Sequence, residues 1–327
     1  MKFLVTGGAG YIGSHMVKYL QDRNFTVDVI DNFSTGNRWA VQNCNVYEID
    51  LLNKKELDNI LSVNNYTAVF HFAAKSLVSE SFTDEQIYID NNIAASENLL
   101  EGIIKYNIKN IIFSSTASVF GSVNSVKIDE SHTKIPINPY GLTKLRFEEK
   151  LREQSSKRNI NAVVLRYFNA AGADESGTIG EYHQPETHLI PSIFNNVLNE
   201  GKVLNIYGND HTTKDGTCIR DYIHVTDLVH AHFLAFNKLV HENGFFDFNL
   251  GNGNGFSVLE IIKACEFILK KKVNYQFVSK RIGEPGHLVA DSSKAISELK
   301  WKIIYSDINE IIETAWRWHN RLYSEII

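Results

Sequence analysis

The sequence predicts a doubly wound α/β fold, in which helices cover both faces of a parallel sheet, followed by a smaller mixed α/β region. Two observations support this. Short apolar runs alternate with helical patterns through the first half of the chain, and a glycine-rich turn joins the first run to the first helical pattern. Several runs are almost continuously apolar, as is typical of strands covered on both faces. Such alternation predicts parallel strands with right-handed crossovers.

The expected elements follow one another in a regular order. The predicted strands are Lys2–Thr6, Thr26–Asp31, Asn45–Asp50, Ala68–Ala73, Asn110–Thr116 and Asn161–Asn169. The predicted helices between them are Tyr11–Arg23, Lys54–Asn64, Glu85–Tyr106 and Tyr140–Lys157. The alternation ends in a stretch rich in glycine and small residues, Ala170–Glu186, which indicates a loop or domain junction. We therefore expect a dinucleotide-binding domain over 1–170 and a substrate domain over 171–327, with some segments of the second returning to the first.

Composition excludes several classes of partner. The 327 residues carry a formal net charge of −5, and no run rich in lysine and arginine stands out. Nucleic acid or a membrane surface is therefore not expected as the main partner. The three cysteines are far apart and odd in number, which favours a reducing compartment. Because a signal-peptide pattern and a long apolar run are also lacking, we expect a cytoplasmic protein.

The first glycine-rich turn indicates a dinucleotide site of the Rossmann type. Gly7, Gly10 and Gly13 follow the first strand, and the next residues open the first helix. Glycine allows the tight turn and the close approach of a pyrophosphate, while the helix N-terminus offers free N–H groups. Tyr11 and Ile12 belong to the same turn.

The second strand ends in Asp31, where a carboxylate can accept hydrogen bonds from the adenosine ribose. The same carboxylate would repel a 2′-phosphate, so we expect NAD rather than NADP. Other strand ends should line the same crevice, since ligands bind at the carboxyl ends of parallel strands. These further candidates for cofactor binding are Asn32, Asp50, Leu51, Phe72, Ala73, Ala74 and Ser114. For Asp50 a contact to adenine and a solvated loop position are nearly equally plausible.

A tyrosine and a lysine four residues apart provide candidate acid–base chemistry. Tyr140 and Lys144 would share one face of a helix that begins after Asn138-Pro139. A free phenol has a pKa of about 10, and a nearby ammonium together with the positive nicotinamide should lower it. Such a tyrosine could remove a proton from a sugar hydroxyl, and Lys144 could also bond the nicotinamide ribose. Ser114, Ser115 and Thr116 close the fifth strand, and a hydroxyl there could share that substrate hydroxyl with Tyr140. The pattern alone is also compatible with a surface pair.

The sequence gives no familiar metal-binding pattern. None of the twelve histidines lies in an HExxH or similar spacing, so we expect no metal ion.

With these motifs in place, the chain resembles the extended short-chain dehydrogenase/reductase family, and within it the nucleotide-sugar epimerases. The resemblance covers almost the whole chain. It is carried by VTGGAGYIGSH, HFAA, FSSTASVFG, NPYGLTK, LRYFNAAGA, ETHLIP, DGTCIRDYIHV, NLGNGNGFSV and RIGEPGHLVADSSKA.

The resemblance implies an activity. Members of the epimerase branch invert C4 of a UDP-hexose, converting UDP-glucose and UDP-galactose into each other. They do so by reversible hydride transfer to tightly bound NAD, through a 4-keto sugar that rotates in the site. A homodimer is also implied.

The resemblance also implies residue roles. Tyr140 is the implied base, Lys144 its partner and Thr116 the group that bonds O4, while Asn91 and Phe168 would lie near the cofactor. The implied substrate-binding residues are Asn169, His188, Leu189, Asn205, Tyr207, Arg220, Arg281 and Glu284.

Three other functions compete with this interpretation of the sequence. A 4,6-dehydratase would carry an Asp-Glu pair where this chain has Ala117-Ser118, which cannot perform general acid–base catalysis. Epimerisation of UDP-GlcNAc and UDP-GalNAc is a closer alternative, because the pocket-wall position that sets this choice in the family matches Leu288, a residue of intermediate size. A non-catalytic NAD sensor should lack the tyrosine or the lysine, and both are present.

Overall fold

A seven-stranded parallel sheet forms the centre of the molecule. The computed structural model describes residues 1–123, 125–199 and 201–326. The strand order is β10-β6-β5-β4-β1-β2-β3, and each neighbouring pair is parallel. The strands are β1 (Lys2–Thr6), β2 (Thr26–Asp31), β3 (Asn45–Glu48), β4 (Ala68–His71), β5 (Asn110–Thr116), β6 (Asn161–Tyr167) and β10 (Phe245–Leu250). The predicted fold class is confirmed.

Helices cover both faces of this sheet. On one face, α1 (Tyr11–Gln21) and α8 (Val225–His241) pack over a core that includes Met16, Leu228 and Phe236. The other face is covered by α2 (Lys54–Val63), α5 (Ala95–Lys105) and α6 (Pro139–Ser156). The shorter helices are α3 (Val78–Thr83), α4 (Glu85–Tyr88) and α10 (Ser293–Glu298). Between α4 and α5 the predicted long helix widens into a π-helical turn over Ile89–Ala94.

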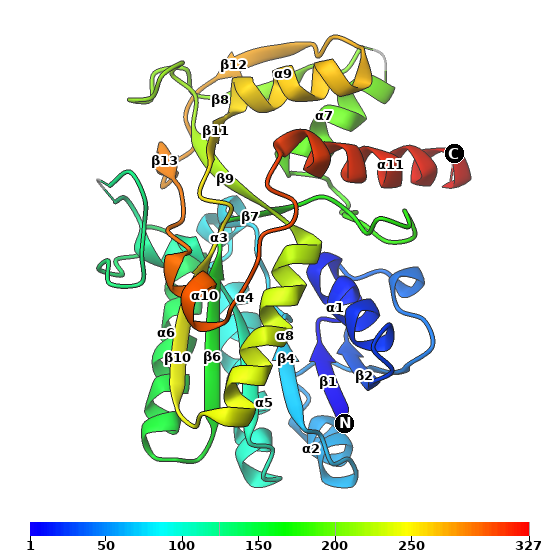
Figure 1. The fold of residues 1–327 in the computed structure, drawn as a ribbon, viewed down its shortest axis with the longest axis vertical. Coiled ribbons are helices and arrows are strands. Elements are labelled where there is room, and N and C mark those ends of the chain that lie inside the picture. Colours follow the sequence, from blue (N-terminus) through cyan, green and yellow to red (C-terminus); the bar gives the residue numbers. More distant parts are fainter. Residues whose placement is uncertain (124, 200, 327) are drawn as a thin grey trace.

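A smaller region lies beyond the carboxyl ends of the strands, in the upper part of Figure 1. It contains two small sheets and three helices around a third apolar core. Its strands are β7 (Asn169–Ala171), β8 (Leu204–Tyr207), β9 (Ile219–His224), β11 (Gly255–Ser257), β12 (Tyr275–Val278) and β13 (His287–Leu288). Its helices are α7 (Leu189–Leu198), α9 (Val258–Leu269) and α11 (Ile308–Ile326).

The chain passes between the two regions more than once. After β7 and β9 it returns through α8 and β10, and β10 extends the large sheet by pairing with β6. It then enters the smaller region again at β11. Segments from both halves of the chain therefore meet at the carboxyl edge of the large sheet.

The start of α6 is fixed by its own sequence. The Asn138 side chain accepts a hydrogen bond from the Gly141 backbone N–H at 2.8 Å, and Pro139 occupies the first turn. Both residue types are favoured there, because asparagine caps the free N–H groups and proline needs no donor. Tyr140 therefore lies in the first helical turn, as the sequence predicted.

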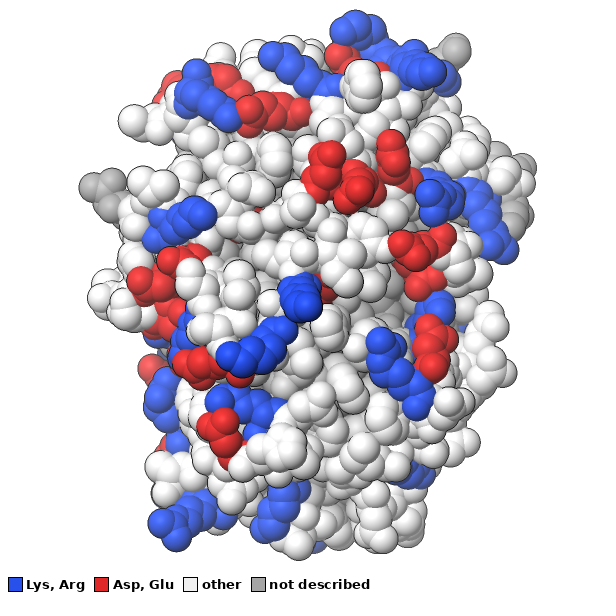
Figure 2. All heavy atoms as spheres, viewed as in Figure 1, with Lys and Arg blue, Asp and Glu red and all other residues white. Residues whose placement is uncertain are grey.

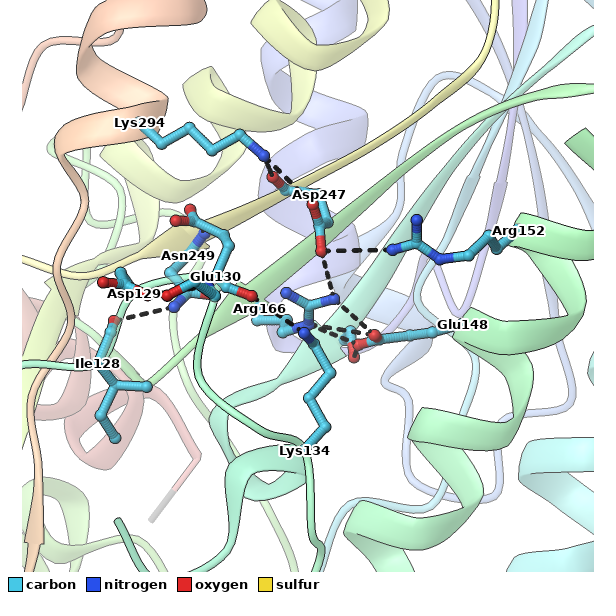
Figure 3. Close-up of polar contacts among 12 residues, drawn as sticks. Ile128, Asp129, Glu130, Lys134, Glu148, Arg152, Arg166, Asp247, Asn249 and Lys294 are labelled. Carbon is cyan, nitrogen blue, oxygen red and sulfur yellow. Dashed lines mark hydrogen bonds and ion pairs between the residues drawn. The ribbon is translucent and has the colours of Figure 1, made fainter. Parts of the chain in front are cut away.

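A buried ion network holds α6 against the sheet (Figure 3). Arg166 on β6 contacts Glu148 on α6 with N–O distances of 2.9 and 2.7 Å, and its Nη2 donates to Asp247 on β10 at 2.8 Å. The Arg166 side chain is fully buried. Arg152 and Lys294 reach Asp247 from the rim at 3.7 and 3.2 Å. The network thus joins β6, α6 and β10.

The surface shows no dominant charge. On the face drawn in Figure 2, basic and acidic side chains are interspersed rather than gathered into one patch. Over the described ranges, no helix combines the length and apolar character that a membrane span requires.

We predict that Arg166→Met lowers the free energy of unfolding by about 3 to 5 kcal/mol, because Glu148 would be left as an unpaired buried charge. Arg152→Met removes a cation of the same network whose side chain is 60% exposed, and it should cost less than about 1 kcal/mol. Urea denaturation of both variants measures the difference. Equal losses of unfolding free energy in the two variants would contradict the assignment of Arg166 as the central residue of the ion network.

Candidate active site

One cavity of about 880 Å³ opens at the carboxyl edge of the large sheet, between it and the smaller region. The ends of β2 and β5, the turns that follow β1 and β4, and the start of α6 line one side, and residues from β7, α7 and the segment before β13 line the other. The predicted site residues that line it are Gly7, Gly10, Tyr11, Ile12, Gly13, Asp31, Asn32, Asp50, Leu51, Phe72, Ala73, Ala74, Asn91, Ser114, Thr116, Tyr140, Lys144, Phe168, Asn169, His188, Leu189, Tyr207, Arg220, Arg281 and Glu284.

Asn205 is the predicted site residue outside this lining. It lies on β8, and its Oδ1 accepts a hydrogen bond from Gln276 on β12 at 2.8 Å. Residues two apart along a strand point to the same face, so Asn205 shares a face with Tyr207 and yet does not line the cavity. Tyr207 does reach the cavity wall.

The glycine turn has the shape that a pyrophosphate needs. Gly7 has a φ of +70°, and a Cβ there would lie 2.5 Å from the Ala73 backbone nitrogen. A Cβ on Gly13 would lie 2.1 Å from the Gly7 carbonyl oxygen, so both glycines are required by the protein's own packing. A Cβ on Gly10 would meet only that same oxygen, at 3.4 Å. Gly10 instead keeps the start of α1 open to the cavity, which fits a phosphate at a helix N-terminus.

Asp31 is positioned at the second strand end. Its carboxylate accepts hydrogen bonds from the Ala9 N–H at 2.9 Å and the Phe33 N–H at 2.8 Å. Burial raises the pKa of this carboxyl group, and these two hydrogen bonds oppose the rise. Nearby, Asn32 donates to Asp50 at 2.8 Å. The residues present therefore fit an adenosine ribose and adenine at this end of the cavity.

Tyr140, Lys144 and Thr116 meet near the middle of the cavity. Tyr140 and Lys144 are only 9% and 3% exposed, so the helical pair is not a surface pair. Lys144 donates to the Ser114 carbonyl at 2.9 Å, with its ammonium 4.8 Å from the centre of the Phe113 ring. The Thr116 hydroxyl hydrogen-bonds the Tyr140 phenol. The helix and the end of β5 thus present three polar groups to one space.

Burial has the largest effect on the pKa values of Tyr140 and Lys144. It raises the pKa of Tyr140 to about 12, and the hydrogen bond from Thr116 opposes the rise. It lowers the pKa of Lys144 to about 7, against the opposing charge of Glu148. Protein groups alone therefore leave the pKa of Tyr140 above its ordinary value, and the lowering that the sequence predicted depends on the nicotinamide charge as well. A further positive charge beside the phenol is needed to favour the phenolate.

Sequence reasoning missed Asn92. Its Oδ1 accepts from the Lys75 N–H at 2.8 Å, while its Nδ2 donates to the Lys75 carbonyl at 2.9 Å and to Thr143 Oγ1 at 3.2 Å. It therefore ties the loop after β4 to α6. Asn92 lies on the π-helical turn, whose geometry is frequent at functional sites, and no local sequence pattern indicated that turn.

The arginines lie on the opposite wall. Arg220 donates to Glu284 Oε1 at 3.1 Å, and the Arg281 guanidinium lies 3.8 Å from the centre of the Tyr207 ring. Asp221 does not pair with Arg220. It is buried and accepts the backbone N–H groups of Asn252, Gly253 and Ala290, while burial raises its pKa to about 6. Two guanidinium groups are thus available to an anionic ligand.

The fold and this site together define a class of protein, and comparison with known proteins places the chain in it. Residues 3–251 match the NAD dependent epimerase/dehydratase family, and the chain belongs to this family. The cofactor named for this family, NAD, agrees with a glycine turn that can accept a dinucleotide pyrophosphate.

Individual relatives show which members of this family the chain resembles. The chain is 42% identical to a UDP-glucose 4-epimerase of Halalkalibacterium halodurans, over 98% of this chain and 96% of that protein. It superposes on UDP-glucose 4-epimerase from Bifidobacterium longum in complex with NAD+ and UDP with a TM-score of 0.94, at 34% identity and 98% coverage of both chains. The UDP-Glc/GlcNAc 4-epimerase from Campylobacter jejuni gives a TM-score of 0.83, at 35% identity, over 98% of this chain and 99% of that chain.

We predict that Asp31→Ala relaxes the preference for NAD+ over NADP+, because it removes the charge that would repel a 2′-phosphate. Dissociation constants for both dinucleotides, measured by calorimetry, provide the test. Asp22→Ala, at an exposed acid just after α1, is the matched control and should leave the ratio of the two constants unchanged. An unchanged ratio in Asp31→Ala would refute the ribose assignment.

Proposed function

We propose that this protein interconverts UDP-glucose and UDP-galactose by oxidising and re-reducing C4 of the hexose. The observation that carries the proposal is one cavity that joins the glycine turn, the Tyr140–Lys144–Thr116 group and the two arginines. The matched relatives named UDP-glucose 4-epimerase support it.

The first region of the chain is proposed to hold NAD. Gly7, Gly10 and Gly13 form the pyrophosphate turn, Asp31 meets the adenosine ribose, and Lys144 meets the nicotinamide ribose. When bound, the oxidised nicotinamide supplies positive charge near the phenol, accepts the C4 hydride and later returns it. Because no net oxidation results, tight retention of the dinucleotide is expected.

Tyr140 is proposed to move the proton. Its phenolate takes the proton from O4 as hydride leaves C4, which leaves a C4 ketone, and the phenol later returns that proton. Thr116 shares O4 and lowers the pKa of the phenol through its hydrogen bond. Because Tyr140 and Lys144 are buried, water is excluded from the ketone. Lys144 donates to the Ser114 carbonyl and lies on the same face of α6 as Tyr140.

The UDP group is proposed to be anchored on the opposite wall while the sugar turns over. Arg220 and Arg281 suit the diphosphate oxygens, since a guanidinium fork matches phosphate geometry. Leu189 and Tyr207 are proposed to contact the uridine, and Asn169, His188 and Glu284 also line the cavity. This one cavity of about 880 Å³ would hold the dinucleotide and the UDP-hexose together, so rotation of the ketone is proposed on the family resemblance.

The division of the chain, the cellular location and the oligomeric state are also part of the proposal. We propose a dinucleotide-binding part over 1–170 and a UDP-sugar-binding part over 171–327. The proposed NAD contacts come from the first part, and the two arginines proposed to bind the diphosphate come from the second. A cytoplasmic location suits the free cysteines Cys44, Cys218 and Cys265. A homodimer is proposed on the family resemblance alone.

Activity on N-acetylated UDP-sugars is the second candidate. Leu288 is buried and lines the cavity, and its size is proposed to limit the C2 substituent of the sugar. The resemblance of the fold to a UDP-Glc/GlcNAc 4-epimerase favours keeping this candidate. Proton NMR of reactions with UDP-galactose and UDP-GalNAc, run separately, distinguishes hexose preference from dual specificity.

We predict that Tyr140→Phe lowers turnover of UDP-galactose about 100-fold or more, because the proton carrier is removed, while NAD+ remains bound. Turnover is followed by NMR, and bound NAD+ is quantified after denaturation. Tyr66→Phe is the control, since Tyr66 is equally buried but its hydroxyl contacts Asp28 outside the cavity. Full activity of Tyr140→Phe would remove the phenol from the mechanism.

A further inference from the structure

Four side chains that can bind metal ions gather at the cavity wall, away from Tyr140 and Lys144. They are Glu181, His183, Glu186 and His188, and one ligand atom from each lies within 4.8 Å of the others. We propose that they form a site for one divalent transition-metal ion, with zinc as the best match. Two imidazoles and two carboxylates suit Zn²⁺ better than Mg²⁺ or Ca²⁺, which prefer oxygen ligands throughout.

The spacing of the ligand atoms agrees with this assignment. At zinc distances of about 2.0 to 2.2 Å, two ligands of a tetrahedral ion lie about 3.4 Å apart. His183 Nδ1 lies 3.4 Å from Glu186 Oε2 and 3.7 Å from Glu181 Oε1. His188 Nδ1 is in direct contact with the same Glu181 oxygen. For four-fold coordination, His188 would have to break this contact and move away from Glu181.

The His183 ring provides an independent sign of a ligand. Its Nδ1 is buried and makes no hydrogen bond of normal geometry, although it faces both carboxylates. Buried polar atoms are rarely left unsatisfied in native proteins, and each exception calls for a cause. A metal ion between this nitrogen and the two carboxylates would satisfy it.

The two carboxylates also need a cation. The Glu181 and Glu186 side chains are each only 8% exposed. Among the residues that the structure describes, their ion-pair partners are only His183 and His188. Two neighbouring buried carboxylates are costly unless positive charge compensates them; the paired histidines would supply it when protonated, and a divalent ion would supply it when they are neutral.

The surrounding structure already orients these ligands. Glu186 Oε1 accepts the backbone N–H groups of Thr187 and His188, both at 2.8 Å, which leaves Oε2 directed toward His183. The carbonyl of Glu181 accepts a hydrogen bond from Trp318 Nε1 at 3.0 Å, so α11 supports the first ligand. Fixed ligands of this kind are typical of metal sites.

A bound ion would cross-link the segment that forms this wall of the cavity. The ligands span the segment between β7 and α7, and His188 immediately precedes Leu189, the first residue of α7. A bound ion would hold this segment and the start of α7 in one arrangement. The site takes no part in the chemistry at C4, so its occupancy can be measured without an activity assay.

Metal binding to the full-length protein, purified without a histidine tag and stripped with a chelator, tests the proposal. After equilibration with Zn²⁺ and gel filtration, elemental analysis should find about one zinc per chain. In His183→Gln/Glu186→Gln the affinity should fall at least about 100-fold, since losing even an outer-shell partner costs about 10- to 100-fold. The control His241→Gln/Glu242→Gln alters an exposed pair at the end of α8 and should bind zinc like the wild type.

Two further readouts separate a built site from adventitious binding. Co²⁺ in place of zinc should give the intense visible absorption of four-fold coordination in the wild type and not in the double variant. Zinc should raise the melting temperature of the wild type and the control but not of the double variant, whose fold is checked by circular dichroism. Absence of zinc from the wild type, or equal zinc affinity in the double variant, would overturn the proposal.

Discussion

The buried contact between Glu148 and Arg166 fixes the helix on which the candidate chemistry depends. Glu148 follows Lys144 by one helical turn and also accepts a hydrogen bond from Ser115, which lies between Ser114 and Thr116 on β5. One carboxylate thus joins α6 to both β5 and β6. Replacing a buried pair with apolar side chains is often neutral for stability, so its main effect here is geometric. It keeps Tyr140 opposite Thr116 and Lys144 against the Ser114 carbonyl.

Burial then sets the protonation of the pair. It shifts Tyr140 and Lys144 in opposite directions, and both shifts favour the neutral form of the side chain. The phenol is consequently a weak acid until positive charge arrives beside it. This couples proton removal to the presence of an oxidised dinucleotide, because a pyridinium carries that charge and its reduced form does not. The same exclusion of water protects a ketone intermediate from side reactions.

Much of the fold could be predicted from the sequence because its signals are local. The apolar runs, the glycine turn and the Asn138-Pro139 cap each depend on a few neighbouring residues, and β1, β2 and β5 begin and end where expected. Features that depend on distant residues were not predictable. Asn92 acts through a π-helical turn, and Arg220 pairs with Glu284, which is 64 residues away. His183 and His188 belong to no helical metal-binding motif, and the folding of the loop in which they lie brings them together. The roles assigned to individual site residues stay predictions.

The hydrogen removed from C4 is expected to return to the same carbon as hydride, without passing through solvent. Incubation of the protein with UDP-galactose deuterated at C4, in ordinary water, tests this directly. Mass spectrometry and NMR of the UDP-glucose formed should show deuterium fully retained at C4. Replacement of the label by solvent hydrogen at that carbon would contradict the account.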